Sequence, residues 1–125
     1  MNMNEKKQPL GSLRISKDVI ATIVGYAAGE VEGVHSLATL SSNIKGIISQ
    51  RKIVKPVTVA LLEDTAIIDI QVILAYGAKI PAVSVAIQEA VKEAVQSMTG
   101  IAVSKVNITI AGIDYGTGSA KEATV

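Results

Sequence analysis

The side chains that could support catalysis are few and scattered along the chain. His35 is the single histidine, and there is no cysteine. A general base needs a nearby nucleophile or an orienting carboxylate. Ser36 and the pair Ser41–Ser42 lie close to His35 in sequence, but no known motif connects them to an acidic residue. We therefore interpret His35 as a loop residue or a partly buried imidazole, and we predict no catalytic residues.

The acidic residues also lack a pattern that would support acid–base or metal chemistry. Glu63 and Asp64 fit a turn, and Asp69 is placed to pair with Lys or Arg on an exposed sheet face. Zinc sites need clusters of Cys and His, which this chain does not have. The sequence contains neither a Walker motif nor G-x-G-x-x-G. We predict no cofactor and no metal.

The segment from Ser41 to Pro56 has an unusual charge, because it contains four basic residues and no acidic one. One interpretation is a short helix that covers the domain and has a solvated basic end. The other is a docking patch for a partner. A protein partner is favoured over a membrane surface or nucleic acid, because the apolar face is small and stacking aromatics are missing. The candidate partner-binding residues are Ile44, Lys45, Ile47, Ile48, Arg51, Lys52 and Lys55.

The composition favours a folded protein that associates with others. The 125 residues suffice for one domain, and the net charge is +1. Hydrophobic residues make up 49% of the chain, while charged residues make up only 18% against a typical value of about 25%. The longest stretch without charge, Gly33–Ile44, has 12 residues, and a membrane-spanning helix needs about 20. Because Met1–Pro9 also lacks a secretory signal, we expect a cytoplasmic location.

We expect one domain over residues 11–114, with a disordered lead-in over 1–10 and a flexible tail over 115–125. Alternating residues predict a short first strand at Leu13–Ile15. Ser16 is a suitable N-cap for a helix from Lys17 to about Val31. Two glycines inside this helix, Gly25 and Gly29, indicate either close packing against a sheet or a helix–helix contact.

A hairpin is predicted around Glu63–Asp64, with Val57 opposite Ile70 and Leu61 opposite Ala66. This register places both apolar sets on one face, and a slip by one residue would separate them. The other face still contains three large apolar side chains, which are the candidate self-association residues Leu62, Ile67 and Ile73. Either residues 34–55 or another subunit is expected to cover that face.

A second amphipathic helix is predicted over Pro81–Thr99, followed by a last strand around Val106–Ile110. The order of elements predicts an α+β domain with two amphipathic helices on one face of a mostly antiparallel sheet. A ferredoxin-like strand order is our expectation for its topology.

Three collinear stretches resemble the alkaline-shock-protein family, also called the envelope stress response family, of Gram-positive bacteria. They are Gly11–Val34, Ala66–Val83 and Ile87–Ile113. Two motifs carry most of this resemblance, namely Y-G-x-x-I-P at Tyr76–Pro81 and V-x-x-M-T-G-I-x-V-x-x-V-N-I at Val95–Ile108.

The resemblance implies a non-enzymatic cytoplasmic protein of cell-envelope homeostasis and stress response. Some members are held at the membrane by a small membrane-anchored partner and self-assemble, and others are linked to control of fatty-acid synthesis. The family provides no catalytic or ligand residues to transfer. We expect a homo-oligomer that docks on a membrane-anchored or lipid-synthesis partner. The alternative is a small nucleic-acid-binding α+β domain that uses the basic segment.

Overall fold

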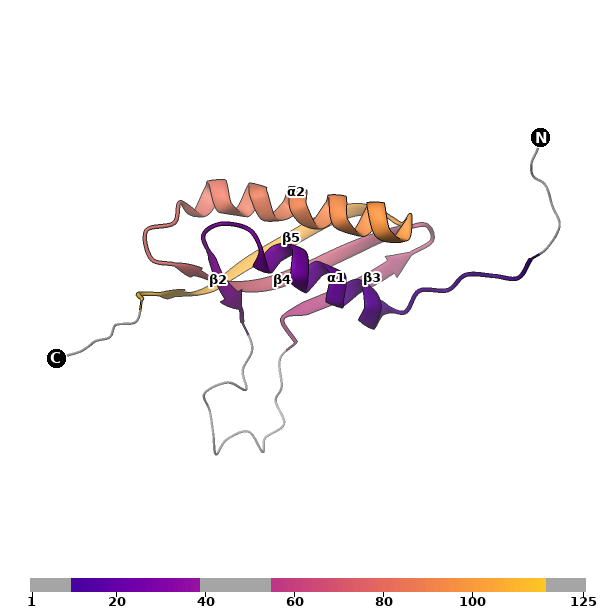
Figure 1. Cartoon of the computed structure of the whole chain (residues 1–125), viewed down its shortest axis with the longest axis horizontal. Coiled ribbons are helices and arrows are strands. Elements are labelled where there is room, and N and C mark those ends of the chain that lie inside the picture. The colour runs from indigo at the N-terminus through magenta and orange to yellow at the C-terminus, as the bar shows by residue number, and fades with distance from the viewer. Residues whose placement is uncertain (1–9, 39–54, 117–125) are drawn as a thin grey trace, which may run out of the picture.

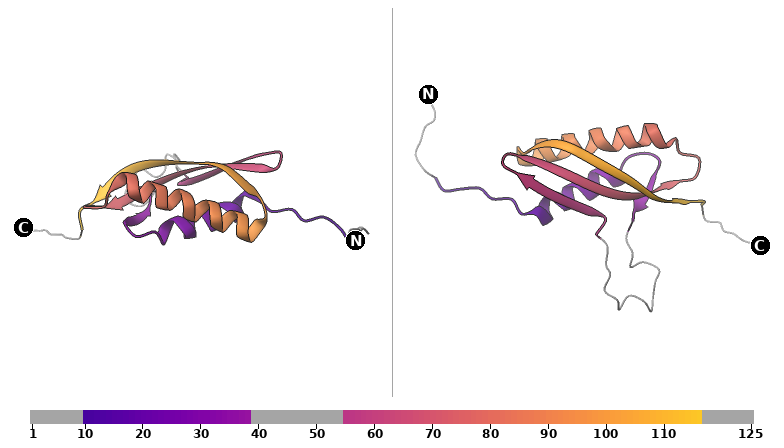
Figure 2. Two further views of the ribbon diagram at one scale, coloured as in Figure 1. Left: turned by 90° about the horizontal axis from the view of Figure 1, so that it is seen from above. Right: turned by 180° about the vertical axis from the view of Figure 1, so that it is seen from behind.

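A computed structural model describes residues 10–38 and 55–116. These residues form, in chain order, α1 (Lys17–Gly29), β2 (Val34–Leu37), β3 (Val57–Leu62), β4 (Thr65–Ala75), α2 (Ile80–Thr99) and β5 (Ala102–Asp114). Both helices lie on the same face of one sheet, so the domain has two layers (Figure 1; Figure 2, left). The expected α+β class with two helices on one sheet face is confirmed.

Strand β4 is the centre of the sheet. On one edge it pairs antiparallel with β3 over its first half and with the short β2 over its second half. On the other edge it pairs in parallel with β5 along its whole length. Two of these three pairings are antiparallel, so the sheet is mostly antiparallel, as expected. The ferredoxin-like strand order is not confirmed.

The expected first strand at Leu13–Ile15 is wrong. These residues form an extended segment without strand pairing, and it leads away from the body of the domain (Figure 1). Leu13 is 80% exposed. Both edges of β4 are already occupied by β2, β3 and β5, which leaves no place beside β4 for a further short strand.

Helix α1 begins at the predicted residue and ends two residues early. The side chain of Ser16 accepts a hydrogen bond from the amide of Val19 at 3.2 Å, so Ser16 is the predicted N-cap. The helix ends at Gly29 instead of Val31. Gly33, with a φ of +101°, lies in the turn that follows.

The two internal glycines of α1 differ in their surroundings. A Cβ atom added at Gly25 would lie 3.2 Å from Cδ1 of Leu37 in β2, whereas one added at Gly29 would meet nothing within 4 Å. The prediction of close packing against the sheet therefore holds for Gly25. The buried side chains of the helix are Ile20, Val24 and Ala28.

Helix α2 agrees with the prediction to within one residue. It has Pro81 in its first turn and ends at Thr99. The C-cap residue Gly100 has a φ of +79°, the left-handed conformation common at helix C-termini. Its buried residues recur every fourth position: Val83, Ile87, Val91 and Val95. Together, β4, α2 and β5 form a βαβ unit, which is why β4 and β5 run parallel.

The β3–β4 hairpin has the predicted register, with Val57 opposite Ile70 and Leu61 opposite Ala66. Its turn contains Glu63, the one non-glycine residue with positive φ in the described part of the chain, at 54°. The inner face is buried against both helices through Val57, Val59, Ala66, Ile68, Ile70, Val72 and Leu74. This core is aliphatic and branched, which accounts for a chain with so few aromatic residues.

Candidate functional site

The outer face of the sheet is the first candidate surface. Strand alternation and register place the following residues on it: Thr58, Ala60 and Leu62 from β3; Thr65, Ile67, Asp69, Gln71, Ile73 and Ala75 from β4; Ala102, Lys105, Asn107, Thr109, Gly112 and Asp114 from β5. Both helices lie on the opposite face (Figure 2). Within residues 10–38 and 55–116, no element covers the outer face.

The structure describes part of the segment 34–55, which was one of the two expected covers of the outer face. Residues 34–37, which were the beginning of the predicted covering segment, join the sheet as β2 beside β4 instead of lying over its face. Residues 39–54 lie outside the described part of the chain. A second subunit therefore remains a prediction for the outer face.

The three candidate self-association residues lie on this face but do not form one compact patch. Leu62, which is 52% exposed, lies next to the hairpin turn, and Ile67 is on the adjacent strand. Ile73 is six positions further along β4, roughly 20 Å away at the usual rise of a strand. Between the two isoleucines, Asp69 accepts a hydrogen bond from Asn107 at 3.0 Å. The face thus has two apolar regions separated by a polar strip.

The basic docking patch falls mostly outside the described residues. Only Lys55 of its seven candidates is described, and it is exposed directly before Pro56 and β3. Lys55 lines an open groove of about 720 Å³ between α1 and β3, together with Lys17 and Tyr26. The other six candidates, from Ile44 to Lys52, have no described surroundings and stay predictions.

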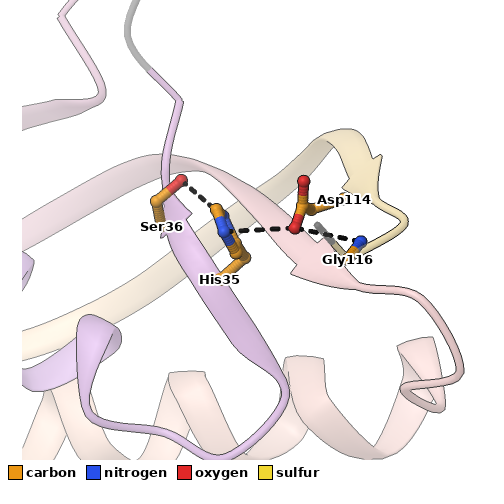
Figure 3. Close-up of polar contacts among 4 residues, drawn as sticks. All are labelled: His35, Ser36, Asp114 and Gly116. Carbon is orange, nitrogen blue, oxygen red and sulfur yellow. Dashed lines mark hydrogen bonds and ion pairs between the residues drawn. The ribbon is translucent and has the colours of Figure 1, made fainter. Parts of the chain in front are cut away.

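The structure also brings together polar residues that the sequence did not connect. His35 on β2 and Asp114 at the end of β5 flank β4, and Nε2 of His35 lies 3.2 Å from Oδ2 of Asp114 (Figure 3). Nδ1 of His35 is 3.3 Å from the hydroxyl oxygen of Ser36. The amide of Gly116 donates to the same carboxylate oxygen at 3.3 Å. No sequence spacing signals this contact, because it exists only through the strand order.

The linked order Ser36–His35–Asp114 resembles the connectivity of a hydrolase triad, but the environment differs. In such triads the aspartate is buried, which holds the imidazole in one orientation. Here the side chains of His35 and Asp114 are 50% and 36% exposed. A contact between side chains this exposed contributes at most about 1 kcal/mol. Its geometry supports a role in fastening the end of β5 to β2, across β4.

Two exposed tyrosines border this contact. The rings of Tyr76 and Tyr115 are 5.3 Å apart between centroids, with planes tilted by 36°. They line an open depression with His35, Asp114 and Gly116. Tyr115, the first residue of the expected tail, contacts Tyr76 through this ring pair.

Comparison with known proteins identifies the family. Residues 5–115 match the family of alkaline shock protein 23, which is described as having a cell envelope-related function. The chain belongs to this alkaline-shock-protein family. The match agrees with the resemblance carried by the sequence motifs.

Relatives of this alkaline-shock-family chain occur in Gram-positive bacteria. It is 32% identical over 121 residues to YqhY of Bacillus subtilis (strain 168), covering 94% of this chain and 87% of YqhY. It is 39% identical over 105 residues to Spy1535 of Streptococcus pyogenes serotype M6, covering 83% of this chain and 80% of Spy1535. Neither name states an enzymatic activity.

Among solved structures, a variant of MamM-CTD is similar to this alkaline-shock-family domain, with a TM-score of 0.49 and 12% identity. The similarity covers 79% of this chain and 100% of that chain.

In the described part of the alkaline-shock-family chain, no helix is long and apolar enough to cross a membrane.

Proposed function

We propose that this protein is a non-enzymatic binding protein that supports cell-envelope homeostasis under stress. It acts by associating with copies of itself and by docking on a membrane-anchored or lipid-synthesis partner in the cytoplasm. The family match over residues 5–115 supports the envelope role. The observation that carries the binding role is the outer sheet face, where Leu62 is exposed and Ile67 and Ile73 are partly exposed, and no described element packs over it.

The physical reason is the location of the apolar surface. One face of the sheet is sealed by two helices, and an antiparallel sheet whose other face meets only water usually has polar residues there. Here isoleucines and a leucine replace polar residues at three of those positions. Burial of such side chains against a partner is favourable by about 25 cal/mol per Å² of apolar surface.

Sedimentation velocity over a hundredfold concentration range tests self-association. The full chain is expected to shift from monomer to a larger species as its concentration rises. Leu62→Lys combined with Ile73→Lys is expected to weaken any assembly that uses the outer face. Leu13→Lys is the matched control, because Leu13 is exposed but lies outside the sheet. A monomer at every concentration would contradict self-association.

Docking is tested separately with the basic segment. Arg51→Glu combined with Lys52→Glu is expected to abolish capture of a membrane-anchored or lipid-synthesis partner by the tagged protein, without lowering the melting temperature. Unchanged capture of the partner would show that these two residues are not part of the docking surface.

A further inference from the structure

We propose that the middle of β5, residues 107–111, pairs antiparallel with the same segment of a second copy, so that two sheets join edge to edge. This inference rests on the proposed self-association and adds a second contact surface to the outer face, namely the edge of the sheet formed by β5. Strand β5 has 13 residues and pairs on one edge only, with β4, in the described part of the chain. Viewed from behind the sheet, β5 runs along its border beneath α2 (Figure 2, right).

The first part of β5 is protected against such pairing. The side chain of Gln96 in α2 accepts a hydrogen bond from the amide of Val103 at 3.1 Å, and the side chain of Gln88 donates to the carbonyl of Val106 at 3.1 Å. The register also shifts at Ser104, which is a bulge, and Lys105 follows it. Bulges, lysines and covering side chains are the usual means by which edge strands avoid other chains.

The next residues of β5, 107–110, contain no bulge and no lysine. Residues 107–111 read Asn-Ile-Thr-Ile-Ala, with no charge and no proline. The register is regular from Lys105 to Ile110, and the next bulge is at Ala111. An uncharged edge segment with a regular register is a template for another strand. The contrast within one strand indicates that the middle of β5 is left open for pairing.

The side chains of this segment are complementary to themselves. With a twofold axis at Thr109, Ile108 of one copy lies opposite Ile110 of the other, and the two Thr109 residues face each other. Ile108 and Ile110 point toward the helices and are only partly buried in the single chain. Cross-strand neighbours on one face contact directly, so pairing would cover their remaining exposed surface. A twofold contact of this kind needs only one patch, present on both copies.

The side chains of α2 next to β5 also fit a second copy of the chain. Gln88 and Lys92 of α2 line the groove next to β5. Val85 lies one turn before Gln88, on the same side of the helix, and is 50% exposed. Antiparallel pairing of the two β5 edges places both pairs of helices on one side of the joined sheet. Val85 and its counterpart then lie near the axis, and the outer faces of both copies become one continuous surface.

The outer edge of β3, which pairs with no other strand among residues 10–38 and 55–116, is less suited to this contact. Strand β3 has only six residues and follows directly after Pro56. Short edge strands and adjacent prolines both limit pairing with another chain. We therefore use β3 as the control surface in the experiment.

Cysteine cross-linking of the full chain tests the geometry, because the native sequence has no cysteine. Thr109 and Thr58 are exposed residues on the outer face, one on each edge strand. Residues directly opposite in an antiparallel pair have Cα atoms about 4.5–5.5 Å apart, within the range of a disulfide. Under mild oxidation, Thr109→Cys is expected to form a linked dimer at least tenfold faster than Thr58→Cys.

A charge variant supplies a second readout. Thr109→Lys places two ammonium groups opposite each other at the axis, so the dimer dissociation constant is expected to rise at least tenfold. Thr58→Lys is expected to leave it unchanged, and circular dichroism confirms that both variants fold.

The possible outcomes separate the two proposals. If the unmodified chain is a monomer at all concentrations, self-association and this inference both fail. If the unmodified chain forms dimers but Thr109→Cys cross-links no faster than Thr58→Cys, self-association stands and the β5 edge is wrong. Faster cross-linking of Thr109→Cys, together with weaker dimers of Thr109→Lys, is the result that we expect.

Discussion

Gly33, in the turn between α1 and β2, combines a φ of +101° with a close neighbour. A Cβ atom added there would lie 2.8 Å from Cγ2 of Val83 in α2. Gly33→Ala is therefore expected to lower the free energy of unfolding by roughly 1–3 kcal/mol, through backbone strain and displacement of a buried valine. Urea denaturation measures this change.

Gly29 provides the matched control for that substitution. It lies in the last turn of α1, and an added Cβ atom would meet nothing within 4 Å. Gly29→Ala is expected to raise the free energy of unfolding by up to about 1 kcal/mol, because alanine favours the helix. Equal losses at Gly29 and Gly33 would show that the close approach to Val83 has no energetic role.

The candidate residues show which parts of a site sequence patterns can predict. Strand alternation placed Ile67 and Ile73 on the outer face, and the strand registers confirm that placement. The contact between His35 and Asp114 was not predicted, because it depends on β2 and β5 lying on opposite edges of β4. Asp69 was expected to pair with a basic residue. Its hydrogen-bond partner is Asn107, because β5 pairs with β4 and places Asn107 directly beside Asp69.

At the scale of elements, the contact between α2 and β5 can be tested directly. Gln96 is the side chain that accepts from the amide of Val103. Gln96→Ala is expected to speed hydrogen exchange of the Val103 amide about fivefold, since a hydrogen bond of this kind contributes about 1 kcal/mol. Amide exchange followed by nuclear magnetic resonance measures the rate. Glu93→Ala, also on the exposed side of α2, is expected to leave that rate unchanged.

The β3–β4 hairpin has a testable strain at Glu63, whose φ is 54°. Positive φ at the first central residue alone is typical of a type II′ turn, in which glycine is favoured. Glu63→Gly is expected to raise the free energy of unfolding by up to about 1 kcal/mol, and the melting temperature rises with it. Asp64→Gly is the control, and it is expected to lower the melting temperature because no positive φ offsets the added chain entropy. The opposite order would contradict the assigned strain.

Elements with a regular period were predicted well, and the others were not. The four-residue spacing of α2 and the alternation of β3 and β4 are local, so the sequence suffices for them. Strand β2 was not predicted, and its four residues contain a bulge that breaks the alternation. The strand at Leu13–Ile15 alternates but finds no partner, and pairing depends on the whole sheet.

At the scale of the whole molecule, the many aliphatic side chains of this chain of low charge lie both in the core and on the surface. Much of the apolar surface fills the core between the helices and the inner sheet face. Part of the remainder lies on the outer face, at Leu62, and beside β5, at Val85, and no described element covers these two side chains. A chain that keeps such surface gains stability when copies associate, because association removes it from water.

That gain predicts a melting temperature that depends on protein concentration. A hundredfold rise in protein concentration stabilises a folded dimer against two unfolded chains by about 2.7 kcal/mol. Divided between the two chains, this raises the free energy of unfolding by about 1.4 kcal/mol per chain. For a domain of this size, the melting temperature is expected to rise by roughly 5–10 °C. Differential scanning calorimetry at two concentrations measures the rise. Thr109→Lys is expected to remove most of it, and Leu13→Lys is expected to keep it. A melting temperature that stays constant over this range would show that the single chain folds without help from association. It would contradict association as a source of stability.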